Sequence, residues 1–273
     1  MIKNFKIGFI GAGNMATCLI QGMLENGYPT ENIKIADIDK TLLKNQEQKF
    51  KVQSQTNIEI ASNCDVIILA VKPQIIKAVC AEISQFLKDN TLIISIAAGV
   101  RIESIKKFLT KDIAIIRAMP NTPALIKQGA TGVFANQKVN NQQQELVDEL
   151  LKSLGLIKWL ENENLLDVIT ALSGSGPAYL FLMMQSMSDV AQEMGLDKKT
   201  ADLFSIQTTL GASQMALTSQ DDLEILRQNV TSPNGTTFAA LESFKKDNFD
   251  KIIKNAMTQA KQRAKTLGDE LDE

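Results

Sequence analysis

KIGFIGAGNMATCL (Lys6–Leu19) is the stretch that decides the fold, because it joins a short apolar run to a glycine turn and the start of a helix. Gly11, Gly13 and Ala16 have the G-x-G-x-x-A spacing of turns that bind the pyrophosphate of a dinucleotide. Gly11 permits the tight turn, Gly13 lets backbone approach the phosphates, and Ala16 lets the helix lie close to the strand. The stretch predicts dinucleotide binding at the helix N-terminus, although small residues also serve ordinary strand-to-helix turns.

The composition sets limits on fold and function. A length of 273 residues favours two domains over one. The formal charge of -2, without a long basic run, gives no electrostatic reason to expect nucleic acid. Histidine is absent, so hydroxyls, carboxylates, lysines or water must handle any proton. The three cysteines lack a C-x-x-C spacing, which predicts buried thiols rather than disulfides or a metal site.

A cytoplasmic location is expected. No charged and then apolar leader precedes the first strand. The most apolar stretch, Leu165–Met184, contains Asp167 and is interrupted by Gly174, Gly176 and Pro177, which argues against a membrane span.

Short apolar runs alternate with helix-like segments in residues 1–161. Helical spacing is clear in Gln74–Leu87, where Pro73 fits the first turn, and in Arg101–Phe108. The alternation predicts an α/β fold with a Rossmann-type, doubly wound parallel sheet. Its strands after the first are expected at Ile33–Ala36, Val66–Ala70, Leu92–Ser95, Ala114–Arg117, Gly132–Phe134 and Leu156–Leu160, the last two around a helix at Gln142–Leu154.

Residues 162–273 are predicted to form an all-helical second domain. Pro177–Met194 is apolar on more than one face, so we expect it to be buried in the domain or against another subunit. The acidic end, Gly268–Glu273, is expected to fray. The remaining helices are expected at Leu165–Leu172, Thr200–Leu217, Asp222–Asn229, Thr236–Phe244 and Phe249–Leu267.

Asp37 follows the second strand, where dinucleotide-binding folds often place an acid on the adenosine ribose. A carboxylate there favours ribose hydroxyls and repels a 2′-phosphate, which favours NADH over NADPH. The alternative is that Asp37 and Asp39 are turn residues that cap the next helix.

Segments after three further strands are candidates for lining a cofactor. Ala70-Val71-Lys72-Pro73 leaves the carboxyl end of a strand, the edge at which open α/β sheets bind ligands. A solvent-exposed lysine and a helix-starting proline explain the same residues without a ligand. The small residues of Ile96–Gly99 leave room for a flat ring, and the prolines of Met119–Pro123 predict a rigid rim.

Two hydroxyl-rich loops lie in the helical part. LSGSGPAY at Leu172–Tyr179 places Ser173 and Ser175 before a long helix, and NVTSPNGTT at Asn229–Thr237 repeats the arrangement. Free N–H groups at such helix starts bind a carboxylate. An N-cap with a turn explains either loop alone, but two in one domain favour a ligand site.

Taken together, these motifs make the sequence similar to the pyrroline-5-carboxylate reductase family over nearly the whole chain. The resemblance implies an NAD(P)H-binding first domain and a helical domain that forms an interwoven homodimer, with dimers often assembled into decamers. It implies reduction of 1-pyrroline-5-carboxylate to L-proline. The motifs are FIGAGNMA at Phe9–Ala16, DVIILAVKP at Asp65–Pro73, SIAAGV at Ser95–Val100, RAMPNTPA at Arg117–Ala124, ALSGSGPAY at Ala171–Tyr179 and NVTSPNGTT at Asn229–Thr237.

The resemblance also implies roles for individual residues. Thr236 and Thr237 should meet the substrate, whose carboxylate would lie on the N–H groups around Gly235, while the Thr237 hydroxyl would hydrogen-bond to the imine nitrogen. Ser173, Ser175 and Ser232 complete the expected substrate site. The expected cofactor contacts are Ile10, Gly11, Ala12, Gly13, Asn14, Met15, Asn57, Ala70, Val71, Lys72, Pro73, Ile96, Ala97 and Ala98, with Glu163 and Asn229 as additions. Asp37 joins them on its position after the second strand, not on the resemblance.

The chain departs from the family pattern at two places. Asp37-Ile38 stands where NADPH-using relatives often have Ser or Asn, sometimes followed by Arg. Asn234 stands where the family usually has glycine, and Asn tolerates a left-handed backbone nearly as readily.

Two other functions share the same general plan. A β-hydroxyacid dehydrogenase would need a lysine one turn after its G-S-G loop, and Ala178–Val190 contains none. A non-catalytic dinucleotide sensor would bind NAD(P)H without oxidising it, but both hydroxyl loops are present.

Overall fold

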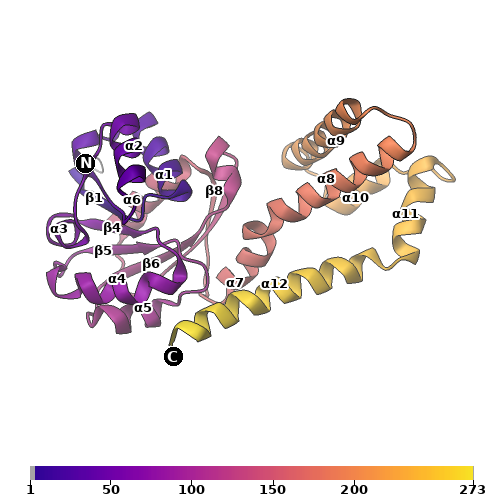
Figure 1. Ribbon diagram of the computed structural model, residues 1–273. Coiled ribbons are helices and arrows are strands. Elements are labelled where there is room, and N and C mark those ends of the chain that lie inside the picture. Colours follow the sequence, from indigo (N-terminus) through magenta and orange to yellow (C-terminus); the bar gives the residue numbers. More distant parts are fainter. Residues whose placement is uncertain (1–3, 273) are drawn as a thin grey trace. The chain divides into compact units, whose positions relative to one another are not determined.

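The computed structural model describes residues 4–272 of the chain. Contacts divide it into two compact units, a sheet unit made of Met1–Ser175 with Ala260–Glu273, and a helical unit made of Gly176–Gln259. Figure 1 labels the elements of both units. The predicted boundary after Glu161 differs from this division, because the segment after Glu161 packs on the sheet through Leu166 and Ile169, which approach Gly132.

The sheet unit is built on one sheet with the strand order β3-β2-β1-β4-β5-β6-β7-β8. β1 pairs in parallel with β2 and with β4, as the alternating pattern predicted. β5 pairs in parallel with both β4 and β6. The strands are β1 (Ile7–Ile10), β2 (Ile33–Ala36), β3 (Gln53–Ser54), β4 (Val66–Leu69), β5 (Leu92–Ser95), β6 (Ala114–Met119), β7 (Gly129–Ala135) and β8 (Gly155–Trp159).

The sheet is not parallel throughout, in contrast to the prediction. β7 runs antiparallel to β6, and β8 is parallel to β7. Only a short connection containing a 3-10 turn, Thr122–Ile126, separates β6 from β7. A parallel return needs a crossover of a dozen or more residues, so the short connection forces an antiparallel pair.

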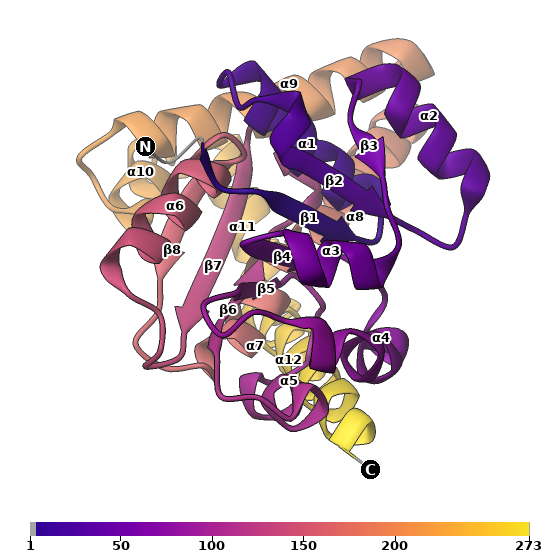
Figure 2. The same ribbon diagram turned by 90° about the vertical axis from the view of Figure 1, so that its left-hand side faces the viewer.

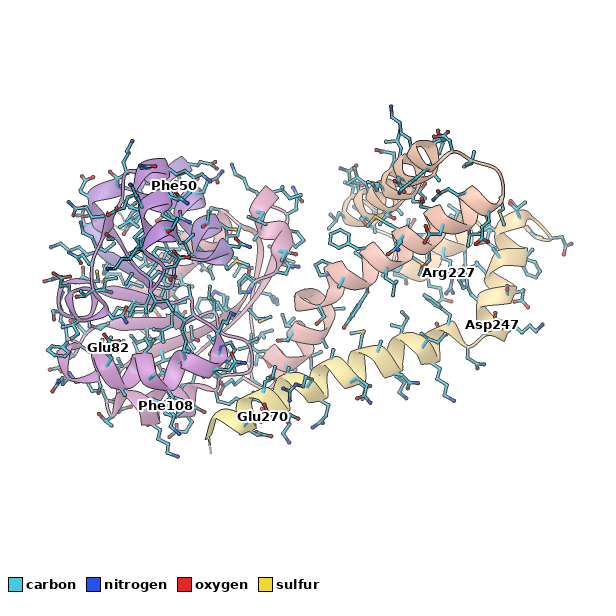
Figure 3. All side chains as sticks on the ribbon, in the orientation of Figure 1. Phe50, Glu82, Phe108, Arg227, Asp247 and Glu270 are labelled. Atoms are coloured by element: carbon cyan, nitrogen blue, oxygen red, sulfur yellow. The ribbon has the colours of Figure 1, made fainter. Side chains whose placement is uncertain are left out.

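Helices cover both faces of the sheet, as Figure 2 shows. Alternate residues of each strand enter two separate cores. Ile7 and Phe9 of β1 pack with α1, α2 and α6, whereas Ile10 packs with α3, α4 and α5. These helices are α1 (Asn14–Glu25), α2 (Lys40–Phe50), α3 (Asn57–Asn63), α4 (Ile76–Ile83), α5 (Ile102–Leu109) and α6 (Asn141–Lys152). The side chains that fill both cores are drawn in Figure 3, where Phe50 of α2 and Phe108 of α5 are labelled.

The segment from Ala260 belongs to the sheet unit, and Gly268 packs closely against Gly99 there. A Cβ on Gly268 would lie 2.4 Å from the carbonyl oxygen of Gly99. Gly99 itself has φ +82°, a conformation that favours glycine. The prediction that Gly268–Glu273 frays is wrong for Gly268, which is buried, and Glu273 lies outside the described residues.

The helical unit consists of helices, as predicted. α8 and α9 pack on each other, and most large apolar side chains of α8 are exposed, among them Leu180, Phe181 and Leu182 at 51%, 63% and 65%. The helices of this part of the chain are α7 (Leu165–Ile169), α8 (Gly176–Glu193), α9 (Lys198–Thr218), α10 (Leu223–Asn229), α11 (Thr236–Lys246) and α12 (Phe249–Asp272).

The predicted interruption between Leu165 and Met184 is wrong. A π-helical turn, Thr170–Gly174, joins α7 to α8, so Leu165–Glu193 forms one helical run. By length and composition this run could cross a membrane, and 17% of its most apolar window is buried. The run nevertheless holds Asp167 in a buried ion pair with Arg101.

Candidate functional site

The glycine turn after β1 has the geometry that its spacing predicted. Gly11 has φ +101°, and a Cβ there would lie 2.4 Å from the carbonyl oxygen of Ala70. The Gly11 N–H donates to the Ala36 carbonyl at 2.8 Å. Only glycine fits this position, because a side chain would need a strained backbone and would collide with the neighbouring strand end.

Gly13 differs from Gly11 because its surroundings are open. Apart from Gly13 itself and its chain neighbours Ala12 and Asn14, no atom of the described residues lies within 4 Å of the position that a Gly13 Cβ would take. Gly13 is the N-cap of α1, and no side chain in the described part of the chain caps this helix. The first N–H groups of α1, from Asn14 and Met15, therefore remain available to an anion.

The cofactor candidates of four strands lie side by side at one sheet edge. Ile10 pairs with Ala36 on one side and with Leu69 on the other, and Leu69 pairs with Ser95. The residues that follow these strand ends are therefore neighbours: the glycine turn, Asp37, the segment Ala70–Pro73 and the segment Ile96–Ala98. This edge is where doubly wound folds bind dinucleotides.

The Asp37 carboxylate is held by two backbone N–H groups. Oδ2 accepts from Ala12 N at 2.8 Å, and Oδ1 accepts from Asp39 N at 2.9 Å. Helix capping falls to Asp39, whose carboxylate accepts from Thr41 N and Leu42 N. Asp37 thus does not cap α2; it ties the glycine turn to the β2–α2 loop and stays partly exposed at the sheet edge.

Gln46 of α2 also supports the glycine turn, a contact that sequence reasoning missed. Its Nε2 donates to the Ala12 carbonyl at 3.2 Å and to the Thr17 hydroxyl. Gln46 is only 6% exposed. The fold decides the burial of Gln46, since a glutamine in a polar helix is by default solvent-facing, so no signal in the sequence indicated this role.

The other cofactor candidates of the sheet unit are placed as follows. Lys72 is exposed and precedes the 3-10 turn Pro73–Ile75, with Pro73 at its first position. Asn57 begins α3, and its Nδ2 donates to Glu82 Oε2 at 2.8 Å, which ties α3 to α4; Figure 3 labels Glu82. Asn57 therefore already has one protein partner.

Glu163 is part of a buried charged group. Its Oε1 accepts from Arg117 Nη1 at 2.6 Å and from Ile102 N at 2.8 Å. Burial lowers the pKa of Arg117, and the contact with Glu163 opposes that shift. A second pair joins Arg101 Nη2 to Asp167 Oδ2 at 2.5 Å. A cofactor role for Glu163 remains a prediction, and its contacts in the structure are with the protein.

The hydroxyl-rich turn at Ser173 is helical, not an open loop. The Ser173 hydroxyl donates to the Ile169 carbonyl at 3.1 Å, and the Ser175 N–H donates to the Thr170 carbonyl at 2.8 Å. The predicted free N–H groups before α8 are therefore wrong at Ser175, because the π turn uses its N–H. Asn121, which the sequence placed only on a rigid rim, donates from Nδ2 to the Ser173 carbonyl at 3.0 Å.

The second hydroxyl-rich loop, in the helical unit, has the predicted form. Asn234 has φ +58°, in the left-handed region. Gly235 N donates to the Ser232 carbonyl at 3.0 Å and is the N-cap of α11, without a side-chain cap. In the described residues no hydrogen bond involves the hydroxyls of Thr236 or Thr237. The start of α11 therefore presents uncapped N–H groups beside hydroxyls without partners, a set suited to a carboxylate.

The remaining two candidates of this loop lie at its ends. Asn229 is the last residue of α10, and Ser232 opens the turn; both are exposed. Arg227, labelled in Figure 3, lies on the same helix as Asn229 and pairs with Glu224.

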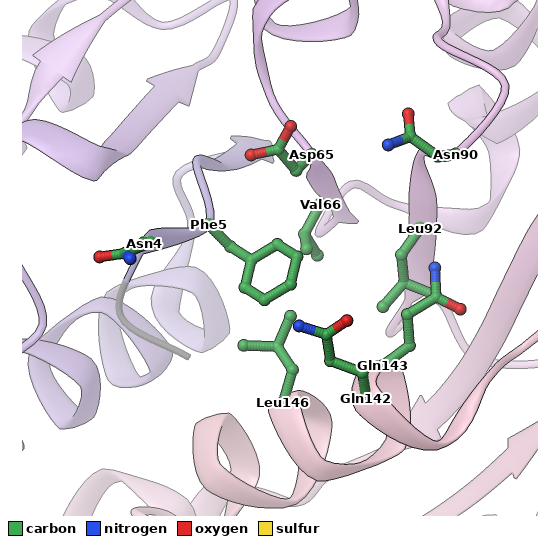
Figure 4. A pocket seen from close by; sticks show the side chains of 9 residues that line it. All are labelled: Asn4, Phe5, Asp65, Val66, Asn90, Leu92, Gln142, Gln143 and Leu146. Carbon is green, nitrogen blue, oxygen red and sulfur yellow. The ribbon is translucent and has the colours of Figure 1, made fainter. Parts of the chain in front are cut away.

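A cavity of about 370 Å³ lies at the opposite, amino edge of the sheet (Figure 4). Its residues lie before or at the start of β1, β4 and β5 and on α6, and Asp65 there is bound to Lys88 at 3.2 Å and to Lys6 N at 2.9 Å. Since open α/β sheets bind ligands at the carboxyl edge, we assign the cofactor to that edge and not to this cavity. The lining residues are Asn4, Phe5, Asp65, Val66, Asn90, Leu92, Gln142, Gln143 and Leu146.

No group of three His, Cys, Asp or Glu side chains among the described residues could hold a metal ion.

Two family models match the chain. Residues 163–267 match the model for pyrroline-5-carboxylate reductase dimerisation, and residues 6–99 match the model for NADP oxidoreductase, coenzyme F420-dependent. The first match covers α7 to most of α12, and the second covers the glycine turn, Asp37 and the two cofactor-lining segments.

Full-length relatives agree with these matches. The pyrroline-5-carboxylate reductase of Pseudomonas aeruginosa is 43% identical over 97% of this chain and 98% of its own. The solved enzyme of Coxiella burnetii is 42% identical with a TM-score of 0.90, covering 96% of this chain and 98% of that one. The Plasmodium falciparum enzyme, solved with NADP bound, is 30% identical with a TM-score of 0.87, covering 97% and 99%. The fold thus has full-length counterparts, and the chain belongs to the pyrroline-5-carboxylate reductase family.

Proposed function

We propose that the chain reduces the C=N bond of 1-pyrroline-5-carboxylate with NAD(P)H to give L-proline, the last step of proline biosynthesis. The observation that carries this proposal is the pairing of two features in one chain. The sheet unit has an uncapped glycine turn with open space at Gly13. The helical unit has an uncapped helix start with two free hydroxyls. Family membership links these features to this reaction.

The residues at the carboxyl edge fit a dinucleotide. The N–H groups of Gly13, Asn14 and Met15 would hold the pyrophosphate, and Asp37 would accept from a ribose hydroxyl. Further contacts are assigned to Ile10, Gly11, Ala12, Asn57, Ala70, Val71, Lys72, Pro73, Ile96, Ala97 and Ala98, with Glu163 and Asn229 as additions. When bound, the reduced nicotinamide supplies the hydride for the imine carbon.

The start of α11 would bind and orient the substrate. Its carboxylate is held by the N–H groups that follow Gly235, and the Thr237 hydroxyl donates to the imine nitrogen. Thr236 and Ser232 flank this contact, and Ser173 and Ser175 shape the other wall. A threonine hydroxyl is a poor acid, so Thr237 positions the ring while the proton arrives with the substrate or through water.

Replacement of Thr237 tests the assignment. Thr237→Ala should lower kcat by about 10²-fold, the loss expected when a reacting group is misplaced by about 1 Å. Thr237→Ser keeps the hydroxyl and should recover most of the rate, because the missing methyl group makes no hydrogen bond. Both variants should unfold at the wild-type temperature, since Thr237 makes no side-chain hydrogen bond in the described structure. Wild-type turnover in Thr237→Ala would remove the residue from the mechanism.

The proposed assembly is a homodimer formed through the helical domain, which we place at residues 162–273, after a dinucleotide-binding domain at 1–161. The dimerisation model begins at Glu163. Exposed apolar side chains of α8 and α9, such as Phe181 and Phe204, would be covered in the dimer. Light scattering would separate a dimer from a larger assembly such as a decamer. A cytoplasmic location is proposed with it, since the three cysteines are free and buried.

A further inference from the structure

Four charged side chains are clustered at the carboxyl edge of the sheet unit. Charged side chains are rarely buried in proteins unless they are paired. Arg117 and Asp167 are 4% and 3% exposed. Arg117 pairs with Glu163 at 2.6 Å, and Arg101 pairs with Asp167 at 2.5 Å. The two pairs also act on each other, since the charges of Arg101 and Asp167 both influence the pKa of Arg117. The cluster is one electrostatic unit with two positive and two negative groups.

The cluster joins the two parts of the sheet unit to which the proposed function assigns chemistry. Arg117 lies on β6 opposite Ser95, the last residue of β5, and the Ile96–Ala98 segment follows directly. Arg101 ends that connection as the N-cap of α5. Asp167 lies on α7, whose π-helical continuation contains Ser173.

A third contact also attaches the segment 163–175 to the sheet edge. Asn121 donates from Nδ2 to the Ser173 carbonyl at 3.0 Å, and its Oδ1 accepts from Ala130 N at 2.9 Å. Segment 163–175 is thus held to the sheet edge at its start by Glu163, in its middle by Asp167 and at its end by Ser173.

The pair between Arg101 and Asp167 depends on a single contact. Asp167 Oδ1 and Arg101 Nη1 are buried and make no hydrogen bond within residues 4–272. A buried ion pair of this kind is weak evidence for stability, because removing both charges from water costs about as much as their attraction returns. Well-packed apolar residues would hold α7 to the sheet equally well, but without a directional contact.

We propose that Arg101 and Asp167 are positioning residues for the imine reduction: their ion pair sets the place of the Ser173–Ser175 turn relative to the Ile96–Ala98 segment. This inference rests on the proposed function, in which Ile96–Ala98 contacts the cofactor and the serines shape the substrate wall. Because hydride transfer needs near-contact geometry, a shift of α7 acts on the transfer step more than on cofactor binding.

The test compares two variants with wild type. Asp167→Asn keeps the side-chain shape but leaves the Arg101 charge unpaired. The double variant Arg101→Met with Asp167→Leu removes both charges and restores an apolar contact. The matched control is Asp112→Asn, which breaks an exposed pair with Lys138 at 2.7 Å at the amino edge of the sheet.

Three quantities are measured: kcat and KM with NADH, the isotope effect with NADH deuterated at the transferred position, and the unfolding temperature. Both test variants should lose about 10- to 100-fold in kcat, with KM for NADH near the wild-type value and a larger isotope effect. The double variant should unfold near the wild-type temperature, so its lost rate does not reflect unfolding. Asp112→Asn should match wild type in all three.

The outcomes separate this inference from the proposed function. If wild type itself does not oxidise NAD(P)H with the imine, the proposed function and this inference both fail. If wild type is active and the double variant keeps its kcat and isotope effect, the inference alone is overturned, because the pair then only stabilises the fold.

Discussion

Alanine substitutions of Gly11 and Gly13, two positions apart in the glycine turn, should have different effects. Gly11→Ala places a Cβ 2.4 Å from the Ala70 oxygen and 2.6 Å from its carbonyl carbon, at φ +101°. The backbone conformation costs about 1–2 kcal/mol for a non-glycine residue. The collision with rigid backbone adds about 1–3 kcal/mol, as overpacking does in other cores.

The sum of about 2–5 kcal/mol predicts a fall of roughly 4–20 °C in the unfolding temperature of the sheet unit, at about 2–4 °C per kcal/mol for a domain of this size. Gly13→Ala should behave differently, because a Cβ there meets no described residue other than its chain neighbours and φ is -68°. Alanine is a poor N-cap, which costs about 0.5–1 kcal/mol.

NAD(P)H binding, unlike stability, should depend more on Gly13 than on Gly11. The methyl group that Gly13→Ala adds would occupy the space through which the backbone approaches the pyrophosphate. Gly13→Ala should therefore weaken NAD(P)H binding by about tenfold or more, equal to about 1.4 kcal/mol, while the protein stays folded.

Thermal unfolding and NAD(P)H fluorescence titration measure the two effects. A Gly11→Ala variant as stable as wild type would show that the strand ends do not approach as described. A Gly13→Ala variant with wild-type affinity would show that the pyrophosphate does not lie on this turn, and the cofactor assignment at the carboxyl edge would fail with it.

Further predictions concern cofactor choice and alkaline stability. Wild type should use NADH at least as well as NADPH. Asp37→Ser should raise the ratio of kcat/KM for NADPH over NADH, because it removes the carboxylate that repels a 2′-phosphate. A strong NADPH preference of wild type in initial-rate assays would contradict this expectation. Burial raises the pKa of Cys64 to about 11 and of Cys80 to about 12 from 9.0 in each case. The folded chain therefore keeps protons that the unfolded chain releases above pH 9, so the free energy of unfolding should fall as pH rises from 9 to about 11. Urea titrations at pH 8 and 10 would show this loss, and it should be smaller in a Cys64→Ala, Cys80→Ala variant; equal losses in both proteins would refute the assignment.

Much of the fold follows from local patterns. The apolar runs at Ile7–Ile10, Val66–Leu69 and Leu92–Ser95 are buried strands within one residue of their predicted bounds, because a strand buried on both faces must be apolar throughout. The Gly11 conformation and the left-handed Asn234 were also predicted correctly, since these depend on the residue's own backbone freedom.

The antiparallel β7 and the course of the chain at Ser173 were not predictable in the same way. Glycine and proline in SGSGP indicate an interruption, but Ser175 N reaches the Thr170 carbonyl and the helix continues through a π turn. Local propensity is a weak prior that packing of the whole segment overrides.

By itself the sequence determined the chemistry available to this protein: a glycine turn before a helix, an acid after the second strand, and hydroxyls before a helix. Only the tertiary structure decided which of these groups are free and which are already bound. Asp37 is held by Ala12 and Asp39, Glu163 by Arg117, and Asp167 by Arg101. The physical reason is that a charged or buried polar group must find a partner. Except for Asp39, these partners lie 25 or more residues away along the chain, where no local pattern can indicate them.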